Sequence, residues 1–229
     1  MTATATTFPV PSPVVPPLRV RAKTVARATR ALARDPGRLD QVLVLAQALN
    51  VGVVKERWGR FAGDAEGRRL LADRPILDRL HVDMNELARL PDGTLGREYA
   101  RFMSDNAITS DPFHDPPSVG DDVAAYVMLR FRQTHDLWHV LTGYAPDVEG
   151  EVLLQAFSYA QTRAPSALFI AAFGSLRYML RRPGHLRRLR EAYRRGVATR
   201  FLGAFRWEDH WRTPVAELRA MLACPAPAT

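Results

Sequence analysis

The sequence predicts an all-α protein, folded as a single-domain bundle of roughly eight helices. After Pro17, apolar residues recur at intervals of three and four almost to the C-terminus, which is the period of a helix with one buried side. No segment alternates polar and apolar residues as a half-buried strand does, and no repeat period is present. The chain has 229 residues, 47% of them hydrophobic, so it can bury one sizeable core.

The start of the chain differs in composition from the rest. Five prolines lie between Phe8 and Pro17, and the first 34 residues contain no acidic residue. We expect residues 1–18 to be a disordered tail rather than a mitochondrial transit peptide, which normally begins as an arginine-bearing amphipathic helix. Residues 19–224 then form the helical domain, and residues 225–229 form a second disordered end.

The first half of the domain is predicted to be a run of helices joined by short turns. Apolar spacing indicates helices over residues 20–33, 39–62, 64–72, 75–90 and 94–103. Pro91, Asp92 and Gly93 form a predicted turn before the last of these. Residues 105–120 contain three prolines and show no periodicity, so they are predicted to be a loop.

The second half begins with a long predicted helix. Asp121 marks its start, because acidic residues suit the N-terminal end of the helix dipole, and it ends near Leu141, ahead of Gly143 and Pro146. Asp147 can cap the helix that follows. The helices of this half are expected over residues 121–141, 148–163, from 165 onward, 184–202 and 213–222.

The charge of the chain favours an anionic partner. The net charge is +8, and arginine supplies all of the basic residues except Lys23 and Lys55. We expect no nucleic acid among the partners, because no known binding module is recognisable and aromatic residues are not interleaved with the arginines. No apolar run reaches the roughly 18 residues needed to span a bilayer. Cys224 is the only cysteine, so no internal disulfide can form.

A cluster of metal-ligand residue types lies in the long helix. His135 and His139 are four residues apart and therefore one turn apart, and Asp136 is about 100° round the helix from His135. A short loop and an antiparallel return would bring Glu151 back toward His139. Two neutral imidazoles and two carboxylates balance a divalent cation. We therefore predict a metal site between two consecutive helices, with all four residues as ligands and with iron, zinc, manganese and cobalt not distinguished.

Two other histidine motifs do not fit the chain. Zinc metalloproteases use glutamate in the sequence His-Glu-x-x-His, where this chain has the shorter Asp136. Phosphohydrolases with an adjacent His-Asp pair need further histidines and aspartates at suitable spacing. The other histidines do not have that spacing and are predicted to be ordinary surface or loop residues: His81, His114, His185 and His210. The alternative to a metal site is that His135 and His139 are ordinary core or surface residues without a ligand role.

The motif and its flanks resemble a known family. His135-Asp136-x-x-His139, followed after eleven residues by Glu151, is similar to the signature of the Coq-four family of ubiquinone (coenzyme Q) biosynthesis. Residues 91–102, 126–132 and 161–162 resemble the family's segments around that signature, and the similarity runs from about residue 91 to residue 180. Two departures are the loop 110–117, which lacks the arginine typical of the family, and Trp138, which is bulkier than the usual aliphatic residue.

The resemblance implies a function as well as a fold. It implies an all-helical protein, associated with a membrane, that binds a divalent metal and removes the C1 carboxylate from a polyprenylated 4-hydroxybenzoate, with or without hydroxylation at C1. On this reading His135, Asp136, His139 and Glu151 are both metal ligands and catalytic residues, and Glu151 doubles as a proton carrier. The alternative from a different class is a non-catalytic scaffold that presents polyprenyl quinone precursors to other enzymes.

Further residues are candidates for substrate and membrane contacts. We assign Arg132 and Gln155 to substrate binding, although Arg132 could instead pair with Asp136 or Glu149. Residues 184–202 are expected to have a packed apolar stripe under an arginine-rich face, which is either solvated or turned toward anionic lipid. The large apolar residues between Ala167 and Gly174 are expected to pack in the core, with a tunnel for an isoprenoid tail as the alternative.

The expected partners and location follow from the same resemblance. The partners are a polyprenylated aromatic substrate, a membrane surface and other ubiquinone biosynthesis enzymes, with a homodimer left open. The expected location is peripheral, on the cytoplasmic face of a bacterial membrane or, in a eukaryote, on the mitochondrial inner membrane.

Overall fold

The computed structural model of the chain is all-helical over the residues it describes. These are residues 10–226 except 36, 79, 109–118, 180 and 181. Apart from short 3-10 turns and an isolated bridge between Thr94 and Pro214, regular structure in this part of the chain consists of α-helices, which confirms the predicted fold class. Their bounds are α1 Leu18–Arg34, α2 Leu39–Asn50, α3 Val54–Gly63, α4 Ala65–Asp73, α5 Met84–Ala88, α6 Leu95–Asp105, α7 Asp122–Gln133, α8 His135–Thr142, α9 Val148–Thr162, α10 Pro165–Met179, α11 His185–Ala198 and α12 Val215–Met221.

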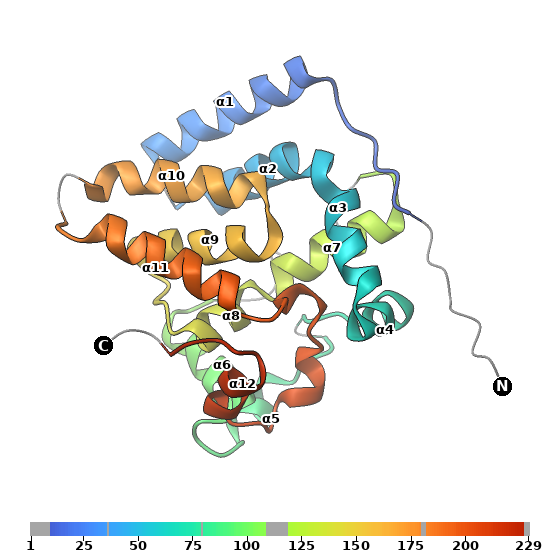
Figure 1. Cartoon of the computed structure of the whole chain (residues 1–229), viewed down its shortest axis with the longest axis vertical. Helices are drawn as coiled ribbons and strands as arrows, with labels where there is room; N and C mark the ends of the chain where they lie inside the picture. Colours follow the sequence, from blue (N-terminus) through green and yellow to red (C-terminus); the bar gives the residue numbers. More distant parts are fainter. Residues whose placement is uncertain (1–9, 36, 79, 109–118, 180–181, 227–229) are drawn as a thin grey trace.

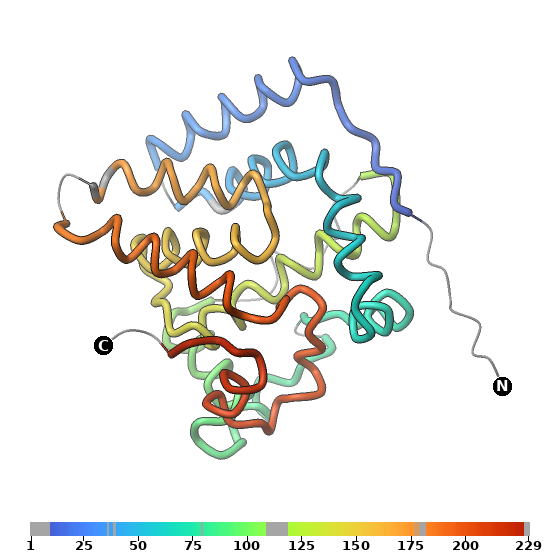
Figure 2. Tube along the Cα trace, in the orientation of Figure 1, coloured from blue at the N-terminus to red at the C-terminus, as the bar shows by residue number. Residues whose placement is uncertain are grey.

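The helices are arranged around α9. Helices α10 and α11 both pack against α9, and α1 lies on the outer side of α2 (Figures 1 and 2). Helices α5, α6 and α12 gather at the opposite end from α1 (Figure 1). The largest core cluster joins α6, α8 and α9 to the segment after α11, through fully buried side chains such as Leu137, Phe157 and Trp207. The predicted metal ligands therefore lie beside the main core.

The predicted helix over residues 39–62 is divided in two. A 3-10 turn over Val51–Val53 separates α2 from α3, in a stretch where Gly52 and β-branched valines weaken the helix. Arg21 of α1 binds the carbonyls freed there, donating from Nε to Ala48 O at 2.7 Å and from Nη2 to Leu49 O at 3.3 Å. A side chain from a neighbouring helix therefore supplies hydrogen bonds to the backbone carbonyls beside the break.

The predicted helix over residues 75–90 is wrong over most of its length. Only Met84–Ala88 is helical, and Asp83 caps its start. Before it, the carboxylate of Asp78 accepts hydrogen bonds from the backbone N–H groups of Leu80 and His81, at 2.9 and 3.1 Å. Such local side-chain bonds compete with the helical backbone pattern. A short helix therefore forms only after Asp83.

The long helix predicted over residues 121–141 is interrupted at Thr134. The hydroxyl of Thr134 donates to Arg130 O at 2.9 Å, and its backbone, at φ −91° and ψ −4°, separates α7 from α8. Bonding of a threonine hydroxyl to the carbonyl four residues earlier bends helices. The predicted start at Asp121 and the predicted cap at Asp147 are confirmed, because Asp121 accepts from Ala124 N and Asp147 accepts from Gly150 N.

The N-terminal tail is only partly described. Of the predicted tail, residues 10–17 are non-helical, and two backbone groups bind the body: Ser12 N donates to Asp121 at 2.9 Å and Val14 N to Val119 O at 2.9 Å. Residues 1–9, residues 227–229 and most of the predicted loop over 105–120, including all of residues 110–117 with His114, lie outside the described residues. Within the described part, no helix combines the length and the apolar character needed to cross a bilayer.

The faces of α10 and α11 differ from the prediction. On α10 the small residues Ala167, Ala171 and Ser175 are buried, whereas the large apolar residues Leu168, Phe173 and Leu176 are exposed. On α11, Leu186 and Val197 of the predicted packed stripe are also exposed, and Ala192 and Gly196 are buried instead. Small residues let these helices approach α9 closely: a Cβ on Gly196 would lie 2.5 Å from Phe157 O. The expected burial is therefore wrong for Leu168, Phe173, Leu186 and Val197, whereas Phe169, Ile170, Leu189 and Tyr193 are half-buried.

Candidate metal centre

Three of the predicted ligands converge on one point. His135 and His139 project from α8, and Glu151 projects from the first turn of α9. Their ligand atoms all lie within 4.8 Å of one another. The carboxylate of Glu151 bridges the two rings, with Oε1 at 3.1 Å from His139 Nε2 and Oε2 at 3.7 Å from His135 Nε2. Carboxylate and rings thus face each other as the spacing predicts.

A tight connection between α8 and α9 creates this convergence. Helix α8 ends at Gly143, whose φ of 75° lies in the left-handed region that glycine adopts readily. Asp147 then starts α9 by accepting from Gly150 N at 2.7 Å. A Cβ on Gly150 would lie 2.0 Å from Ala145 O, so the chain can pass this close only with glycine there. Glu151 consequently faces α8.

His139 is the buried member of the three. Its side chain is 1% exposed, and the ring of Phe102 from α6 stacks on it with centroids 5.3 Å apart. Its Nδ1–H donates to Tyr144 O at 2.9 Å, which leaves Nε2 directed at Glu151. An electropositive atom, either a proton or a metal ion, must therefore lie between Nε2 and the carboxylate.

His135 and Glu151 form the accessible side of the cluster. Their side chains retain 28% and 40% exposure. Burial acts to lower the pKa of His135, but the hydrogen bond with Asp136 and the charge of Glu151 outweigh it and raise that pKa. Burial acts to raise the pKa of Glu151, but the hydrogen bond from His139 and the charges of both histidines hold that pKa below its usual value. Glu151 is therefore a carboxylate at neutral pH.

Asp136 lies beside the cluster rather than in it. Its Oδ1 is 3.5 Å from Nδ1 of His135, on the side of that ring opposite the nitrogen that faces Glu151. A carboxylate in this position fixes the ring orientation of a metal-binding histidine. Asp136 also contributes, after burial, to raising the pKa of Tyr99, so the hydroxyl of Tyr99 stays protonated at neutral pH. The structure thus brings three of the four predicted ligands together.

The two predicted substrate residues have different surroundings. Gln155 lies one turn after Glu151 on α9, with its Nε2 at 3.4 Å from Nε2 of His135. Arg132 is half-buried, and within the described part of the chain its guanidinium makes no hydrogen bond or ion pair. Of the partners considered for Arg132, Glu149 instead binds His185 and Arg188. Arg132 is therefore available to a ligand.

One histidine assignment is wrong. His185 is 1% exposed rather than a surface residue. Its Nε2 lies 3.1 Å from Ser175 Oγ and its Nδ1 lies 3.3 Å from Glu149 Oε1. This network joins the starts of α9 and α11 to α10. The sequence offered no signal for it, because its members come from three separate helices.

Other contributors to the site have no signal in the sequence. They are Phe102, which stacks on His139, Tyr99, which lies near Asp136, and the backbone carbonyl of Tyr144. Phe102 and Tyr99 lie in the predicted helix over residues 94–103, and apolar periodicity in a helix carries no information about a metal site. A backbone carbonyl has no sequence signature. The donor set of two imidazoles and one carboxylate suits zinc and divalent iron, manganese or cobalt.

Comparisons with known proteins all identify relatives from one family. The sequence model of the family described as "Coenzyme Q (ubiquinone) biosynthesis protein Coq4" matches residues 16–227. A mitochondrial ubiquinone biosynthesis protein COQ4 homolog of Xenopus laevis is 37% identical over 186 residues, covering 81% of this chain and 66% of that protein. The chain thus spans just under two thirds of that relative's length. The homolog of Danio rerio is 33% identical, covering 92% of this chain and 81% of that protein.

A solved structure shares the fold. It is the crystal structure of a Nostoc punctiforme protein assigned to ubiquinone biosynthesis, with a TM-score of 0.73 and 28% sequence identity. The match covers 90% of this chain and 97% of the other. The likeness therefore extends over the whole helical domain and not only over the metal-ligand motif.

Proposed function

The chain belongs to the Coq4 family of coenzyme Q (ubiquinone) biosynthesis proteins, and from that premise we propose that it removes the C1 carboxylate from a polyprenylated 4-hydroxybenzoate with the help of a divalent metal. The observation that carries this proposal is the convergence of His135, His139 and Glu151, with an accessible side. Three protein ligands and an accessible side are typical of catalytic metal sites, whereas structural sites are closed by four.

The surroundings of each residue support a specific role. His135, His139 and Glu151 would hold the ion, which would polarise the substrate carboxylate or activate dioxygen beside it. Asp136 would keep the His135 ring in its ligating orientation. Arg132, which has no partner among the described residues, would bind the substrate carboxylate, and Gln155 would donate a hydrogen bond to the ring substituents.

The chemistry suits a 4-hydroxybenzoate. An ionised para oxygen pushes electron density onto C1, which can then accept a proton or an oxygen atom, and the electrons of the bond to the carboxylate return to the ring as carbon dioxide leaves. In plain decarboxylation C1 takes the proton, and Glu151 is the candidate to carry it. In the oxidative form C1 takes a hydroxyl group whose oxygen comes from dioxygen; an external two-electron reductant supplies the electrons, and the second oxygen atom leaves as water. Both forms share the same substrate and the same loss of carbon dioxide.

Turnover of a short-chain prenylated 4-hydroxybenzoate by metal-loaded protein tests this function. We expect carbon dioxide release, and comparison of anaerobic with aerobic reactions separates the plain from the oxidative form. His139→Ala should lose both bound metal and turnover, because it removes the buried ligand. Full activity in a variant shown to be metal-free would contradict the proposal.

The second candidate is a non-catalytic scaffold. A protein that presents polyprenyl quinone precursors to other biosynthetic enzymes would use the metal to stabilise its fold or to hold the ligand. Tight binding of the same substrate with no product formed, under both aerobic and anaerobic conditions, would favour the scaffold. The accessible side of the cluster favours the enzyme.

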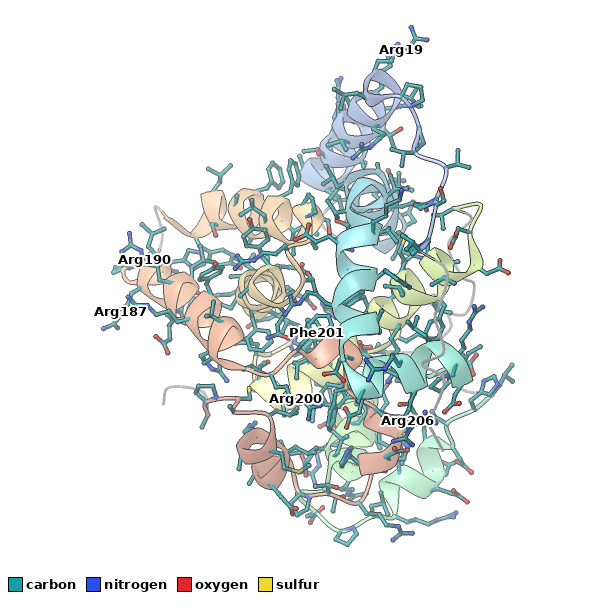
Figure 3. All side chains as sticks on the ribbon, turned by 45° about the vertical axis from the view of Figure 1, so that its right-hand side comes forward. Arg19, Arg187, Arg190, Arg200, Phe201 and Arg206 are labelled. Carbon is teal, nitrogen blue, oxygen red and sulfur yellow. The ribbon has the colours of Figure 1, made fainter. Side chains whose placement is uncertain are left out.

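A membrane surface is the second proposed partner. The exposed apolar residues Leu176 and Leu186 lie at the end of α10 and the start of α11, near in sequence to exposed arginines of α11. Figure 3 shows Arg187 and Arg190 projecting from the end of α11 at the edge of the molecule. Apolar side chains surrounded by cations suit peripheral binding to anionic lipid. The proposed location is therefore a membrane surface: the cytoplasmic face in a bacterium, the mitochondrial inner membrane in a eukaryote.

Protein partners complete the proposal. Other enzymes of the pathway would receive or supply the polyprenylated ring, and a second copy of the chain could cover part of the exposed apolar surface of α10. Sedimentation of the purified chain, with Leu176→Asp as the matched variant, tests whether a second copy of the chain binds there. An unchanged sedimentation coefficient for a monomer at all concentrations would exclude a homodimer on this face.

A further inference from the structure

Glu149 is a buried acid in the first turn of α9, two residues before Glu151. Acidic residues are seldom buried unless they are paired, yet Glu149 is buried while the apolar side chain of Val148 beside it is 50% exposed. The helix does not need Glu149 as a cap, because Asp147 already accepts a hydrogen bond from the backbone of the first turn. The role of Glu149 must therefore come from its contacts with other elements.

The carboxylate of Glu149 is held by side chains of α11 and of the connection before it. Nη2 of Arg188 donates to Oε1, and Nδ1 of His185 lies 3.3 Å from the same oxygen. Nη1 of Arg182 lies 3.6 Å from Oε2. We call Glu149, His185 and Arg188 the α9 clamp. It ties the first turn of α9 to the first turn of α11, two helices that lie side by side (Figure 1).

The ring of His185 in this clamp is itself fixed by α10. Its Nε2 lies 3.1 Å from Ser175 Oγ, and the ring of Tyr178 stacks on it with centroids 5.4 Å apart. The hydroxyl of Ser175 is fixed in turn, because it donates to Ala171 O at 2.6 Å. The imidazole therefore contacts α10 through one nitrogen and Glu149 through the other, which fixes the start of α9 relative to both neighbouring helices.

The clamp and the metal ligand of α9 lie on opposite sides of one helical turn. Successive residues differ by about 100° round a helix, so the side chains of Glu149 and Glu151 point about 160° apart. The first contacts α11, and the second contacts both histidines of α8. Between them Gly150 passes close to the backbone of Ala145, where a Cβ would lie 2.0 Å from the carbonyl oxygen. The direction of Glu151 is therefore coupled to the fixed position of Glu149.

The precision that a metal site requires makes this coupling important. The outer end of a side chain lies about 5–6 Å from its helix axis, so a rotation of α9 by about 10° would move the carboxylate of Glu151 by about 1 Å. Binding groups must be held within about 0.5 Å of their working positions. Among the three converging residues Glu151 alone comes from α9, and its side chain is the most exposed of them. Constraint from the opposite side of the helix therefore replaces packing around the carboxylate.

We infer that Glu149 is a positioning residue for the metal centre: through the α9 clamp it fixes the rotation of the first turn of α9 and thereby directs Glu151 at the metal. This inference rests on the proposed function for the presence of the metal. Glu149 itself would touch neither the metal nor the substrate, because its carboxylate contacts α11. The two acids of this turn thus have separate tasks, one as a ligand and one as the anchor of that ligand.

Cobalt(II) binding tests the inference apart from turnover. Cobalt accepts the same nitrogen and oxygen ligands, and its visible absorption depends on the geometry of coordination. Glu149→Gln keeps the size of the side chain but removes the charge that holds Arg188. Competition with a chelator should show cobalt binding weakened by about 3–30-fold in this variant. At saturating cobalt the stoichiometry should equal that of the wild type, while the visible spectrum should change.

A second variant and a matched control complete the experiment. Arg188→Met breaks the clamp from its exposed side and should weaken cobalt binding by a similar factor. Combining it with Glu149→Gln should add little, because both changes remove one interaction. Asp121→Ala is the control: it also removes one carboxylate from the start of a helix, but at the end of α7 away from α8. We expect Asp121→Ala to bind cobalt as the wild type does.

Urea unfolding of the metal-free proteins separates positioning from folding. A Glu149→Gln chain that loses stability but binds cobalt with unchanged affinity would make Glu149 purely structural and the inference wrong. Equal losses of affinity in Glu149→Gln and Asp121→Ala would assign the effect to net charge and would also overturn it. If Glu149→Gln does not fold, Arg188→Met decides between the same outcomes.

The same measurements separate this inference from the proposed function. Normal decarboxylation by the wild type, combined with a cobalt affinity that does not depend on the α9 clamp, would refute the inference alone. A clamp-dependent cobalt affinity without any decarboxylation would refute the proposed reaction alone. A wild-type chain that binds no metal would contradict both.

Discussion

At the scale of single residues, the two histidines of the site differ because their second nitrogens have different partners. His139 Nδ1–H is fixed by the carbonyl of Tyr144, and His135 Nδ1 faces the carboxylate of Asp136. In each ring Nε2 is thereby left facing Glu151. A backbone acceptor and a carboxylate are the usual outer partners of metal-binding histidines. Asp136 therefore supports a ligand and does not complete the ligand set.

Replacing Asp136 tests this division. Asp136→Asn should weaken metal affinity by about 10–100-fold, the usual cost of losing an outer partner, while the stoichiometry at saturating metal stays at that of the wild type. Competition with a chelator gives the affinity, and metal analysis of the saturated protein gives the stoichiometry. If Asp136→Asn lost bound metal as completely as His139→Ala is expected to, Asp136 would be a direct ligand.

At the scale of elements, the crossing of α9 and α11 depends on glycine. A Cβ on Gly196 would lie 2.5 Å from Phe157 O and 2.8 Å from the Cβ of Ala160. The side chain of Gln161 stabilises the same crossing by donating to Gly196 O at 2.6 Å and Thr199 O at 2.9 Å. The short distance between these two helices therefore depends on small side chains and on the side-chain amide of Gln161.

A pair of alanine substitutions measures the importance of this contact. Gly196→Ala should lower the free energy of unfolding by about 1–3 kcal/mol, because a methyl group is forced against the backbone of α9. Gly59→Ala, in an exposed position of α3 with nothing within 4 Å of the new Cβ, should raise it by about 0.5–1 kcal/mol. Urea unfolding of both variants measures these changes. If Gly196→Ala left the free energy of unfolding unchanged, α9 and α11 could move apart without loss of stability.

The start of α7 gives a pH-dependent prediction. Burial acts to raise the pKa of Asp121, but hydrogen bonds from the backbone N–H groups of Ala124 and Ser12 hold it below its usual value. The stabilisation is therefore present above the unfolded-state pKa of about 3.9 and is lost as the pH falls through the lower folded-state pKa. Asp121→Ala should cost about 1 kcal/mol near neutral pH.

Urea unfolding of wild type and Asp121→Ala between about pH 6 and about pH 3 checks that prediction. The difference in free energy of unfolding should narrow toward the acidic end, because both chains then lack the charged cap. A difference that grows on acidification would contradict the assigned sign.

At the scale of the whole molecule, one edge combines exposed apolar side chains with exposed arginines. The end of α10 and the start of α11 combine Leu176, 63% exposed, and Leu186, 46% exposed, with the exposed Arg187 and Arg190. In the proposed membrane contact, this edge is the part of the protein that faces anionic lipid.

Charge reversal tests that orientation. Arg187→Glu with Arg190→Glu should weaken binding to anionic phospholipid vesicles by about tenfold or more, and added salt should weaken the binding of the unmodified chain. Arg89→Glu with Arg212→Glu makes the same change in net charge at exposed positions near α5 and α12. Equal loss of vesicle binding in both double variants would mean that net charge, not the α10–α11 edge, controls binding.

The sequence by itself determined the all-α class, most helix positions, the helix start at Asp121, the cap at Asp147, and the approach of Glu151 to His135 and His139. These features depend on periodicity, local capping and a short loop, which involve residues near one another in the chain. It misplaced the segment before Met84 and the break at Thr134, where side chains compete with the helical backbone.

Only the tertiary structure decided which faces are buried and which polar groups meet. Small residues of α10 and α11 pack against α9 and leave the large apolar residues outside, because close helix approach depends on the partner's backbone as well as on hydrophobicity. In the same way, the burial of His185, the stacking of Phe102 on His139 and the pairing of Glu149 with Arg188 depend on residues from different helices. Periodicity along one segment carries no information about such distant neighbours.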